Sequence, residues 1–424
     1  MSFRLCSVLL SVLVLIPFGL RWATWPSTRA REYDAVVANK GRELFVHEWR
    51  PGDPLANQGD GLGPVFNATS CVACHSQPSP GGAGGLLHNV TTFTVRPVSL
   101  QRKPLEGVVH VQATRPEFQE SLTHVHSSLP RLSQPPLSDL LPIPGCNVRR
   151  LPFPRGIHIS QRNTPALFGT KLVDAIPGER ILANERRQRL AAGLATSEVE
   201  YSTVGRAVIL ADGRVGRFGW KGQTASLSDF VQAACANELG LGNPGSPQAR
   251  PLTKPDYKPS GLDLTAEQCE QLTSFVAALP RPWEEFPTSV EARGHATAGR
   301  KLFHKIGCAD CHVPDVGDVK GLYSDLLLHR MGAALEGGGA YDEPPLETPQ
   351  FDAGSGPHPS EWRTPPLWGV ADSAPYMHDG RAATLQEAIA LHGGQGARAA
   401  ELFQRHYHDE QQQLIAFLKT LRAP

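Results

Sequence analysis

The chain has 424 residues, enough for two domains that each bury a core. Its 41 Lys and Arg balance its 41 Asp and Glu, and the net charge of zero argues against a nucleic-acid partner, which requires a basic face. The 41 glycines and 37 prolines favour compact helices joined by long ordered loops over long helical bundles or a sheet sandwich.

The N-terminus carries an apolar segment. Arg4 precedes a run without charged residues from Leu5 to Leu20. The run is short for a membrane-spanning helix, which needs about 20 residues, and suits a secretory signal. No clear small-x-small cleavage site follows it, so we predict that residues 1–30 are a signal peptide or an uncleaved membrane anchor. Either alternative predicts an exported protein, located in the periplasm and tethered to the membrane if the segment is an anchor.

The first chemical motif is Cys71-x-x-Cys74-His75, preceded by a predicted amphipathic helix at GRELF, residues 41–45. Two thiols one helical turn apart can reach both vinyl groups of one porphyrin. The histidine that follows then lies under the ring and can supply an axial nitrogen to the iron. The pattern predicts a covalently attached haem c.

The same motif recurs as Cys308-x-x-Cys311-His312, again after a predicted helix, GRKLF at residues 299–303. A zinc site would need two further ligands at short spacing, and neither copy has them. A thioredoxin-like dithiol would lie in a βαβ pattern, which the sequence lacks. We therefore predict two covalently bound haem c groups.

Three further segments also occur twice. RNTPALFG (162–169) recurs as WRTPPLWG (362–369), WKGQTASLSDFVQAA (220–234) as HDGRAATLQEAIALH (378–392), and QLTSFVAALP (271–280) as QLIAFLKTLR (413–422). The last pair has the apolar spacing of a helix that closes a domain. The repeated order predicts a mainly α fold of two cytochrome c-like domains that arose by internal duplication.

The repeats set the predicted domain boundaries. The N-terminal haem domain is expected over residues 31–285 and the C-terminal one over 286–424, with a Pro-bounded linker at 281–287. The first domain carries insertions, at 47–64, 97–150 and 172–217. We expect long loops there, with a few short strands at runs such as VVHVQAT and STVGRAVIL.

Three cysteines remain after haem attachment: Cys146, Cys235 and Cys269. In an oxidising compartment two of them can form a disulfide. We expect the pair to be Cys235 and Cys269, which flank the end of the first domain. Cys146 would then stay unpaired or link at the surface.

Several segments are characteristic of one protein family. They are GLGPVFNATSCVACH, RNTPALFG, GRFGWKGQ, YSDLLLHRMG, RTPPLWG and APYMHDGRAATLQEAIALHGG. Over residues 38–424 the chain resembles the di-haem oxidoreductase (thiol oxidoreductase) family, within the bacterial di-haem cytochrome c peroxidase/MauG superfamily. The resemblance implies two unlike haems. One is a low-spin electron-entry haem with two protein ligands, and the other is the active haem, with an openable face.

The resemblance also implies a second axial ligand for the C-terminal haem. His392 is the favoured residue, with Met377 and then Met331 as the alternatives. Together with His312, His392 would make a bis-His haem, whose potential is lower than that of a His/Met haem.

At the N-terminal haem, the resemblance implies that Glu238 is a general acid/base that moves the peroxide proton. Trp220 would lie between the haems and assist electron transfer. Some of these peroxidases also have a histidine that blocks the N-terminal haem until the enzyme is half-reduced; His88 is the one histidine in the loop after the first motif, but its surroundings depart from the peroxidase pattern. A calcium ion between the domains would be held by Asn163, Ser373 and Pro375 through neutral oxygens.

Together these features predict a peroxidase-like oxidoreductase. A small redox protein would reduce the C-terminal haem, and the electron would pass by Trp220 to the N-terminal haem, where H₂O₂ or a related oxidant is reduced. Two alternatives stay open: MauG-like oxidation of a protein or thiol substrate, and a non-catalytic two-haem electron carrier. Related peroxidases are often dimers, so the resemblance also allows a homodimer.

Overall fold

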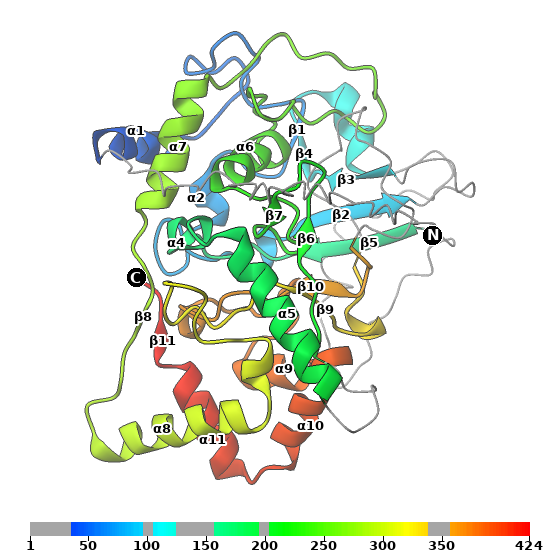
Figure 1. The fold of residues 1–424 in the computed structure, drawn as a ribbon. Helices are drawn as coiled ribbons and strands as arrows, with labels where there is room; N and C mark the ends of the chain where they lie inside the picture. The colour runs from blue at the N-terminus through cyan, green and yellow to red at the C-terminus, as the bar shows by residue number, and fades with distance from the viewer. Residues whose placement is uncertain (1–34, 96–104, 124–156, 195–202, 338–356) are drawn as a thin grey trace, which may run out of the picture.

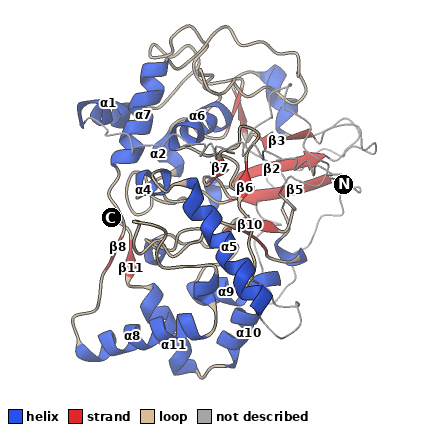
Figure 2. Cartoon of the chain, in the orientation of Figure 1, coloured by secondary structure: helices blue, strands red, loops and turns tan. Residues whose placement is uncertain are grey.

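The computed structural model describes residues 35–95, 105–123, 157–194, 203–337 and 357–424, and over these ranges the fold is mainly α with short strands, as predicted (Figures 1 and 2). The α-helices are α1 Ala35–Val46, α2 Cys71–Cys74, α4 Thr170–Asp174, α5 Gly178–Leu194, α6 Leu227–Glu238, α7 Ala266–Ala278, α8 Val290–Lys305, α9 Leu385–Ala390, α10 Ala397–Arg405 and α11 His408–Leu418. Short 3₁₀ turns are η1 Leu86–His88, η2 Pro116–Leu122, η4 Cys308–Asp310, η5 Ala333–Leu335, η6 Val370–Asp372 and η7 Gly394–Gly396. The strands are β1 Val65–Phe66, β2 Val90–Val95, β3 Leu105–Val109, β4 Gln112–Ala113, β5 Ile157–Arg162, β6 Val208–Ile209, β7 Val215–Gly216, β8 Trp283–Glu284, β9 Leu328–Arg330, β10 Glu361–Arg363 and β11 Leu421–Arg422.

Each haem motif follows a helix that crosses another helix closely, α1 with α7 and α8 with α11 (Figure 1). A Cβ on Gly41 would lie 1.8 Å from the carbonyl oxygen of Gln271, and a Cβ on Gly299 would lie 1.8 Å from that of Gln413. Glycine is therefore required at both crossings. The GRELF and GRKLF helices and both closing helices are confirmed.

Helices α6 and α9 begin in the same way. The Ser226 hydroxyl accepts a hydrogen bond from the Asp229 N–H at 3.1 Å, and the Thr384 hydroxyl accepts one from the Glu387 N–H at 3.2 Å. Ser and Thr are favoured N-caps because they satisfy an amide that the helix leaves unpaired. The repeated segments at 220–234 and 378–392 thus contain the helices expected of them.

A three-stranded antiparallel sheet, β3-β2-β5, lies beside the helices of the first half (Figure 2). Phe93 of β2 faces Gly107 of β3 and Ile159 of β5, and it is fully buried. Strands were expected only in the insertions, whereas β2 lies outside them, between η1 and the insertion at 97–150. Its sequence, VTTFTV, consists of β-branched and aromatic residues that fit a pleated surface.

The two halves meet through equivalent residues of the repeats. The Asn163 N–H donates to the His378 carbonyl at 2.7 Å, and the Arg363 N–H donates to the Trp220 carbonyl at 2.9 Å. Asn163 and Arg363 occupy the same place in the TP segments, as Trp220 and His378 do in the next repeat. One backbone hydrogen bond is thus made twice between the halves.

The insertion at 172–217 differs from the expectation of loops and short strands. It does contain the short strands β6 and β7, but its longest element is the helix α5. The charged sequence GERILANERRQRLAAGL gave little apolar periodicity, yet Ile181 is fully buried. The helix extends to the second half (Figure 1), where the Asn184 amide donates to the Asp325 carbonyl at 3.1 Å.

The predicted disulfide between Cys235 and Cys269 is wrong. Both residues are free cysteines, buried in the core between α6 and α7. In this apolar setting each thiol packs as a small hydrophobic group. Cys146 and the N-terminal apolar run lie outside the described residues. Within the described ranges, no helix has the length and apolar character needed to cross a bilayer.

Candidate haem sites

The N-terminal motif presents His75 in a defined tautomer. Its Nδ1 lies 3.2 Å from the Gly82 carbonyl oxygen. A carbonyl can only accept, so the proton is on Nδ1 and the Nε2 lone pair is left for a metal. Burial lowers the pKa of His75 to about 4, which keeps the ring neutral. This is the state in which histidine binds iron.

The two thiols of this motif lie in a buried setting. Burial raises the pKa of both Cys71 and Cys74 to about 12, and the nearby Glu238 carboxylate adds to the effect on Cys74. Reactive dithiols instead have lowered pKa values and a positive environment. The structure therefore agrees with the rejection of a thioredoxin-like site.

Cys71, Cys74, His75, Trp220 and Glu238 line one cavity of about 110 Å³. Glu238 is the last residue of α6, and the Asn67 amide donates to its Oε2 at 2.6 Å. The Asn67 N–H also donates to the Glu238 carbonyl at 2.7 Å, so one residue fixes both ends of the glutamate. The structure brings the predicted catalytic residues to the first motif.

The C-terminal motif fixes His312 in the same way. Its Nδ1 donates to the Tyr323 carbonyl at 3.0 Å, and burial, with a smaller effect from His392, lowers its pKa to about 4. Tyr323 and Leu326 have positive φ angles of 52° and 60°, which non-glycine residues rarely adopt. The turn after the motif is thus strained where its carbonyl orients the histidine.

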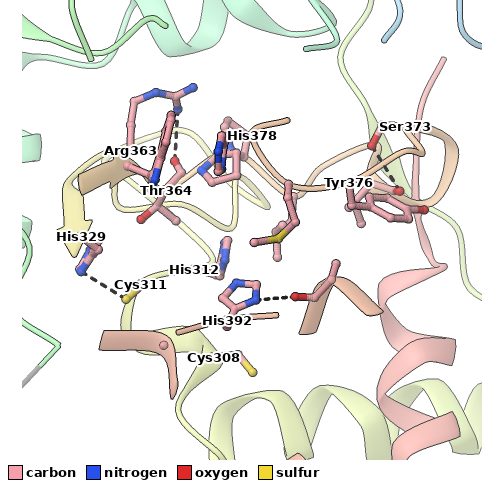
Figure 3. Close-up of a pocket in the computed structure, with 18 of the residues that line it drawn as sticks. Cys308, Cys311, His312, His329, Arg363, Thr364, Ser373, Tyr376, His378 and His392 are labelled. Carbon is pink, nitrogen blue, oxygen red and sulfur yellow. Dashed lines mark hydrogen bonds between the residues drawn. The ribbon is translucent and has the colours of Figure 1, made fainter. Parts of the chain in front are cut away.

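His392 faces His312 across the larger cavity (Figure 3). The ring centroids are 6.5 Å apart, and the His392 Nδ1 donates to the Ala388 carbonyl at 2.7 Å. Two imidazole–metal bonds of about 2 Å each, plus the two ring radii, require roughly this separation. Burial also lowers the pKa of His392. The pair therefore fits one metal between two Nε2 atoms.

Both alternative ligands lie at the same cavity. Met331 and Met377 are among its lining residues, so all three predicted candidates are brought together. Met377 has a φ of 73°, a strained backbone conformation that is held only when its surroundings enforce it. The matching hydrogen bonds of the two histidines favour His392 over either methionine.

The two cavities differ in size. The one at His312, which also contains Cys308 and Cys311 on its wall, has a volume of about 680 Å³. This lies within the range of about 300–1,000 Å³ that is usual for bound cofactors, whereas the 110 Å³ at His75 lies below it. A porphyrin at His75 therefore requires side chains of the cavity wall to move.

A buried network that the sequence analysis did not identify supports the second motif. Cys311 Sγ lies 3.6 Å from His329 Nδ1 (Figure 3). The His329 Nε2 donates to an Asp325 oxygen at 2.8 Å. Gln188 of α5 donates to the same Asp325 oxygen at 2.7 Å. The signal was in SDLLLH, where two ionisable residues four apart interrupt an apolar run.

Trp220 connects the two sites because it lines both cavities. Its indole N–H donates to the Asn163 carbonyl at 3.0 Å. The side chain is therefore part of the wall that the two cavities share.

The three predicted calcium ligands all line the larger cavity. A Cβ on Gly380 would lie 3.0 Å from a Pro375 side-chain carbon and 3.2 Å from the Asn163 amide nitrogen. That nitrogen donates to the Gly84 carbonyl and the Asn89 side chain, which leaves the amide oxygen of Asn163 for a cation. With the Ser373 and Pro375 carbonyls, this neutral oxygen set suits calcium.

His88 is not brought to either haem site. It ends η1 and lines neither cavity, and its carbonyl accepts a hydrogen bond from the Thr164 hydroxyl at 3.3 Å. The idea that it blocks the N-terminal haem has no support from this geometry.

Residues 144–421, about two thirds of the chain, match the family model described as "Di-haem oxidoreductase, putative peroxidase". The chain belongs to the di-haem oxidoreductase family. The match includes the second Cys-x-x-Cys-His motif and both TP segments, and it ends within the last strand.

Two curated proteins are similar to parts of the chain. Hydrazine synthase subunit gamma of Kuenenia stuttgartiensis is 30% identical over 148 residues, which cover 29% of this chain and 40% of that protein. Cytochrome-c peroxidase IdrP1 of Pseudomonas sp. (strain SCT) is 26% identical over 243 residues, covering 48% of this chain and 63% of that protein. Neither alignment reaches two thirds of the relative.

Among solved structures, hydrazine synthase of Kuenenia stuttgartiensis aligns with a TM-score of 0.42 and 16% identity, over 99% of this chain and 100% of that one. The diheme peroxidase BthA from Burkholderia thailandensis E264 aligns with a TM-score of 0.41 and 15% identity, over 92% and 87%. The family assignment depends on the family model and not on these likenesses.

Proposed function

We propose that the chain is an exported di-haem c-type cytochrome with peroxidase-like activity. Cys71 and Cys74 would hold one haem and Cys308 and Cys311 the other, each by thioether bonds. A haem at each motif would supply the one-electron chemistry that side chains lack. The observation that carries the proposal is the contrast between the two sites: His392 faces His312, whereas Glu238 lies at the cavity of His75.

The C-terminal site is the electron entry in this proposal. His312 and His392 would both hold the haem iron at this site, which would leave no place for a substrate. The donor would be a small redox protein of the same compartment. Two imidazoles lower the potential relative to a His/Met pair, which favours onward transfer of the electron.

The N-terminal site is the reaction site. Here Glu238, held by Asn67 at 2.6 Å, would take a proton from H₂O₂ and return it to the departing oxygen as water leaves. Trp220 would lie on the electron path between the cavities that it lines. Calcium held by Asn163, Ser373 and Pro375 would stabilise the contact between the two halves. Trp220 would be fixed with it, because its N–H donates to the Asn163 carbonyl.

The repeats support the idea that the two halves arose by duplication. Equivalent glycines lie at both helix crossings, and equivalent hydrogen bonds join the halves. Export is expected because haem is attached to thiols outside the cytoplasm, and the N-terminal apolar run would direct it. A homodimer is proposed on the basis of the family resemblance alone.

The test is stopped-flow absorbance of the half-reduced holoprotein mixed with H₂O₂. Rapid loss of the reduced-haem band, with sustained turnover when a reduced small cytochrome is supplied, is expected. Oxidation of the haems without turnover by the cytochrome would favour MauG-like oxidation of a protein or thiol. No reaction at all would contradict the proposal and leave a two-haem electron carrier.

A further inference from the structure

A second tryptophan, Trp362, lines the larger cavity together with Trp220, and its surroundings differ from those of Trp220. Trp362 of β10 is buried at the wall of the larger cavity, where its N–H donates to the Leu335 carbonyl at 2.7 Å. The ring of His378 is stacked on it, with centroids 3.7 Å apart and planes inclined by 16°. Burial holds the pKa of His378 well below its usual value, so this stacked ring is neutral.

Two basic side chains contact the indole of Trp362. The Nζ of Lys221 lies 3.6 Å from the ring centroid, and the guanidinium carbon of Arg162 lies 4.4 Å from it. Both residues are buried, so their charges are little screened by water. Both belong to the first half, whereas Trp362 belongs to the second.

The contacts of Lys221 are those of an ammonium group. Its Nζ donates to the carbonyls of His358 at 3.3 Å, Pro359 at 2.9 Å and Glu361 at 2.5 Å. Burial lowers its pKa, but three carbonyl acceptors match the three donors of a protonated lysine, and a neutral amine has only two. Arg162 stays charged in any case. With all its donors used, Lys221 is not a site for an anion.

Trp220 has no such contact. Among the described residues, no lysine or arginine lies over its ring, and its N–H donates to a neutral carbonyl, that of Asn163. It is also half-buried and lines both cavities. The two tryptophans therefore differ in that, among the described residues, cationic groups lie over the ring of Trp362 and none lies over the ring of Trp220.

We propose that Arg162 and Lys221 keep Trp362 reduced, so that an oxidising equivalent between the two sites is held by Trp220 alone. A cation over a neutral indole is attracted to its π face, but removal of one electron makes the ring positive and turns this attraction into repulsion. One electron leaves Trp220 for the oxidant and one returns from the donor, while the indole proton stays on its Asn163 hydrogen bond. Arg162 and Lys221 are thus positioning residues that select the route.

The test maps oxidised tryptophans in the holoprotein by peptide mass spectrometry. Azide radicals made by pulse radiolysis oxidise tryptophan without any turnover, and the half-exposed Trp283 provides an internal reference. We expect oxidation at Trp220 to exceed that at Trp362 in the unmodified protein. Lys221→Met should raise oxidation at Trp362 several-fold relative to Trp283, and Lys221→Arg, which keeps the charge, should not.

Lys221→Met leaves three carbonyls without a donor, so Arg162→Met, with Arg162→Lys as its control, gives a second comparison if the first variant does not fold. Equal oxidation of both tryptophans in the unmodified protein would overturn the proposal. So would folded methionine variants in which Trp362 is oxidised no more than in their charged controls.

The inference depends on the proposed function only for the source of the oxidising equivalent. Repeating the map with H₂O₂ separates the two ideas. If azide radicals give the expected pattern and H₂O₂ oxidises neither residue, the inference stands and peroxidase chemistry does not. If H₂O₂ oxidises Trp362 in preference to Trp220, the inference fails while peroxide reactivity stands.

Discussion

The two haem motifs have the same framework on one side and different groups on the other. Each follows a helix that is pinned at a glycine crossing, and each histidine donates its Nδ1 proton to a backbone carbonyl, Gly82 for His75 and Tyr323 for His312. Opposite His312 lies a second imidazole, whereas the cavity of His75 carries Glu238. The repeats thus preserve the residues that would hold a haem on one side, whereas the residues on the opposite side of each cavity differ.

The support behind the motifs also differs. At the second motif, Gln188 on α5 of the first half reaches the Asp325–His329 pair beside Cys311. At the first motif the corresponding support stays within the first half, because Asn67 fixes Glu238. The C-terminal site is therefore completed by the N-terminal half. At the junction the second half contacts the first through backbone hydrogen bonds and through the Arg363 side chain, which donates to the Gly219 carbonyl at 2.8 Å.

The largest expected effect concerns the group that distinguishes the two sites, Glu238 at the first and His392 at the second. Glu238→Gln removes the acid/base group but keeps an oxygen that can accept from Asn67, so peroxide turnover should fall by roughly 10²–10⁴-fold. The absorbance spectrum of the C-terminal haem should not change. Glu185→Gln, a carboxyl on α5 away from both cavities, is the matched control. Full turnover by Glu238→Gln would remove the chemical distinction between the two sites.

The second prediction concerns the support of the C-terminal motif. Asp325→Asn breaks a fully buried pair with His329, and loss of one partner from such a pair costs about 3–5 kcal/mol of unfolding free energy. Chemical denaturation of the holoprotein measures it. Asp212→Asn breaks an exposed pair with Arg214 and should cost under about 1 kcal/mol. Equal costs for the two variants would show that the buried network does not stabilise the second site.

The third prediction uses pH and the support of the N-terminal site. His110 donates to the Asn237 carbonyl at 2.8 Å, next to Glu238, and burial lowers its pKa to about 4. At a pH between about 4 and the ordinary histidine pKa of about 6.5, His110 binds a proton in the unfolded state but not in the folded state. Stability is therefore lost as the pH falls through this window, by up to about 3 kcal/mol.

His110→Gln can still donate to Asn237 but cannot take up a proton. Urea unfolding at pH 7 and at pH 4.5 should show a smaller loss of stability for this variant than for the unmodified protein. An equal loss in the two proteins would mean that His110 is not held neutral at this site.

The smallest expected effect concerns the glycine at the helix crossing, which the two halves share. Gly41→Ala and Gly299→Ala each place a Cβ against a carbonyl of the crossing helix, and overpacking of this kind costs about 1–3 kcal/mol. Thermal unfolding should show similar losses for the two variants. Gly193→Ala on α5 meets open space and should be neutral or slightly stabilising. A large loss at one crossing and none at the other would break the equivalence of the halves.

The repeats made much of this architecture predictable from sequence, because each repeated segment carried its own apolar spacing, glycine or cap. The helix α5 was missed because a charged helix docked by one buried stripe gives a weak periodic signal. The Cys235–Cys269 disulfide was wrongly predicted because sequence position does not reveal whether a thiol is packed in a core. The Asp325–His329 pair is completed by Gln188, which is far away in the chain, so no local sequence pattern predicts the role of the pair.

The most direct measurement is low-temperature EPR of the fully ferric holoprotein, unmodified and as His392→Ala. The account predicts one high-spin and one low-spin haem in equal amounts in the unmodified protein, because only His312 has a second imidazole opposite it. In His392→Ala the low-spin signal should be replaced by a second high-spin signal. Two low-spin haems in the unmodified protein, or a low-spin signal that survives the substitution, would contradict the account.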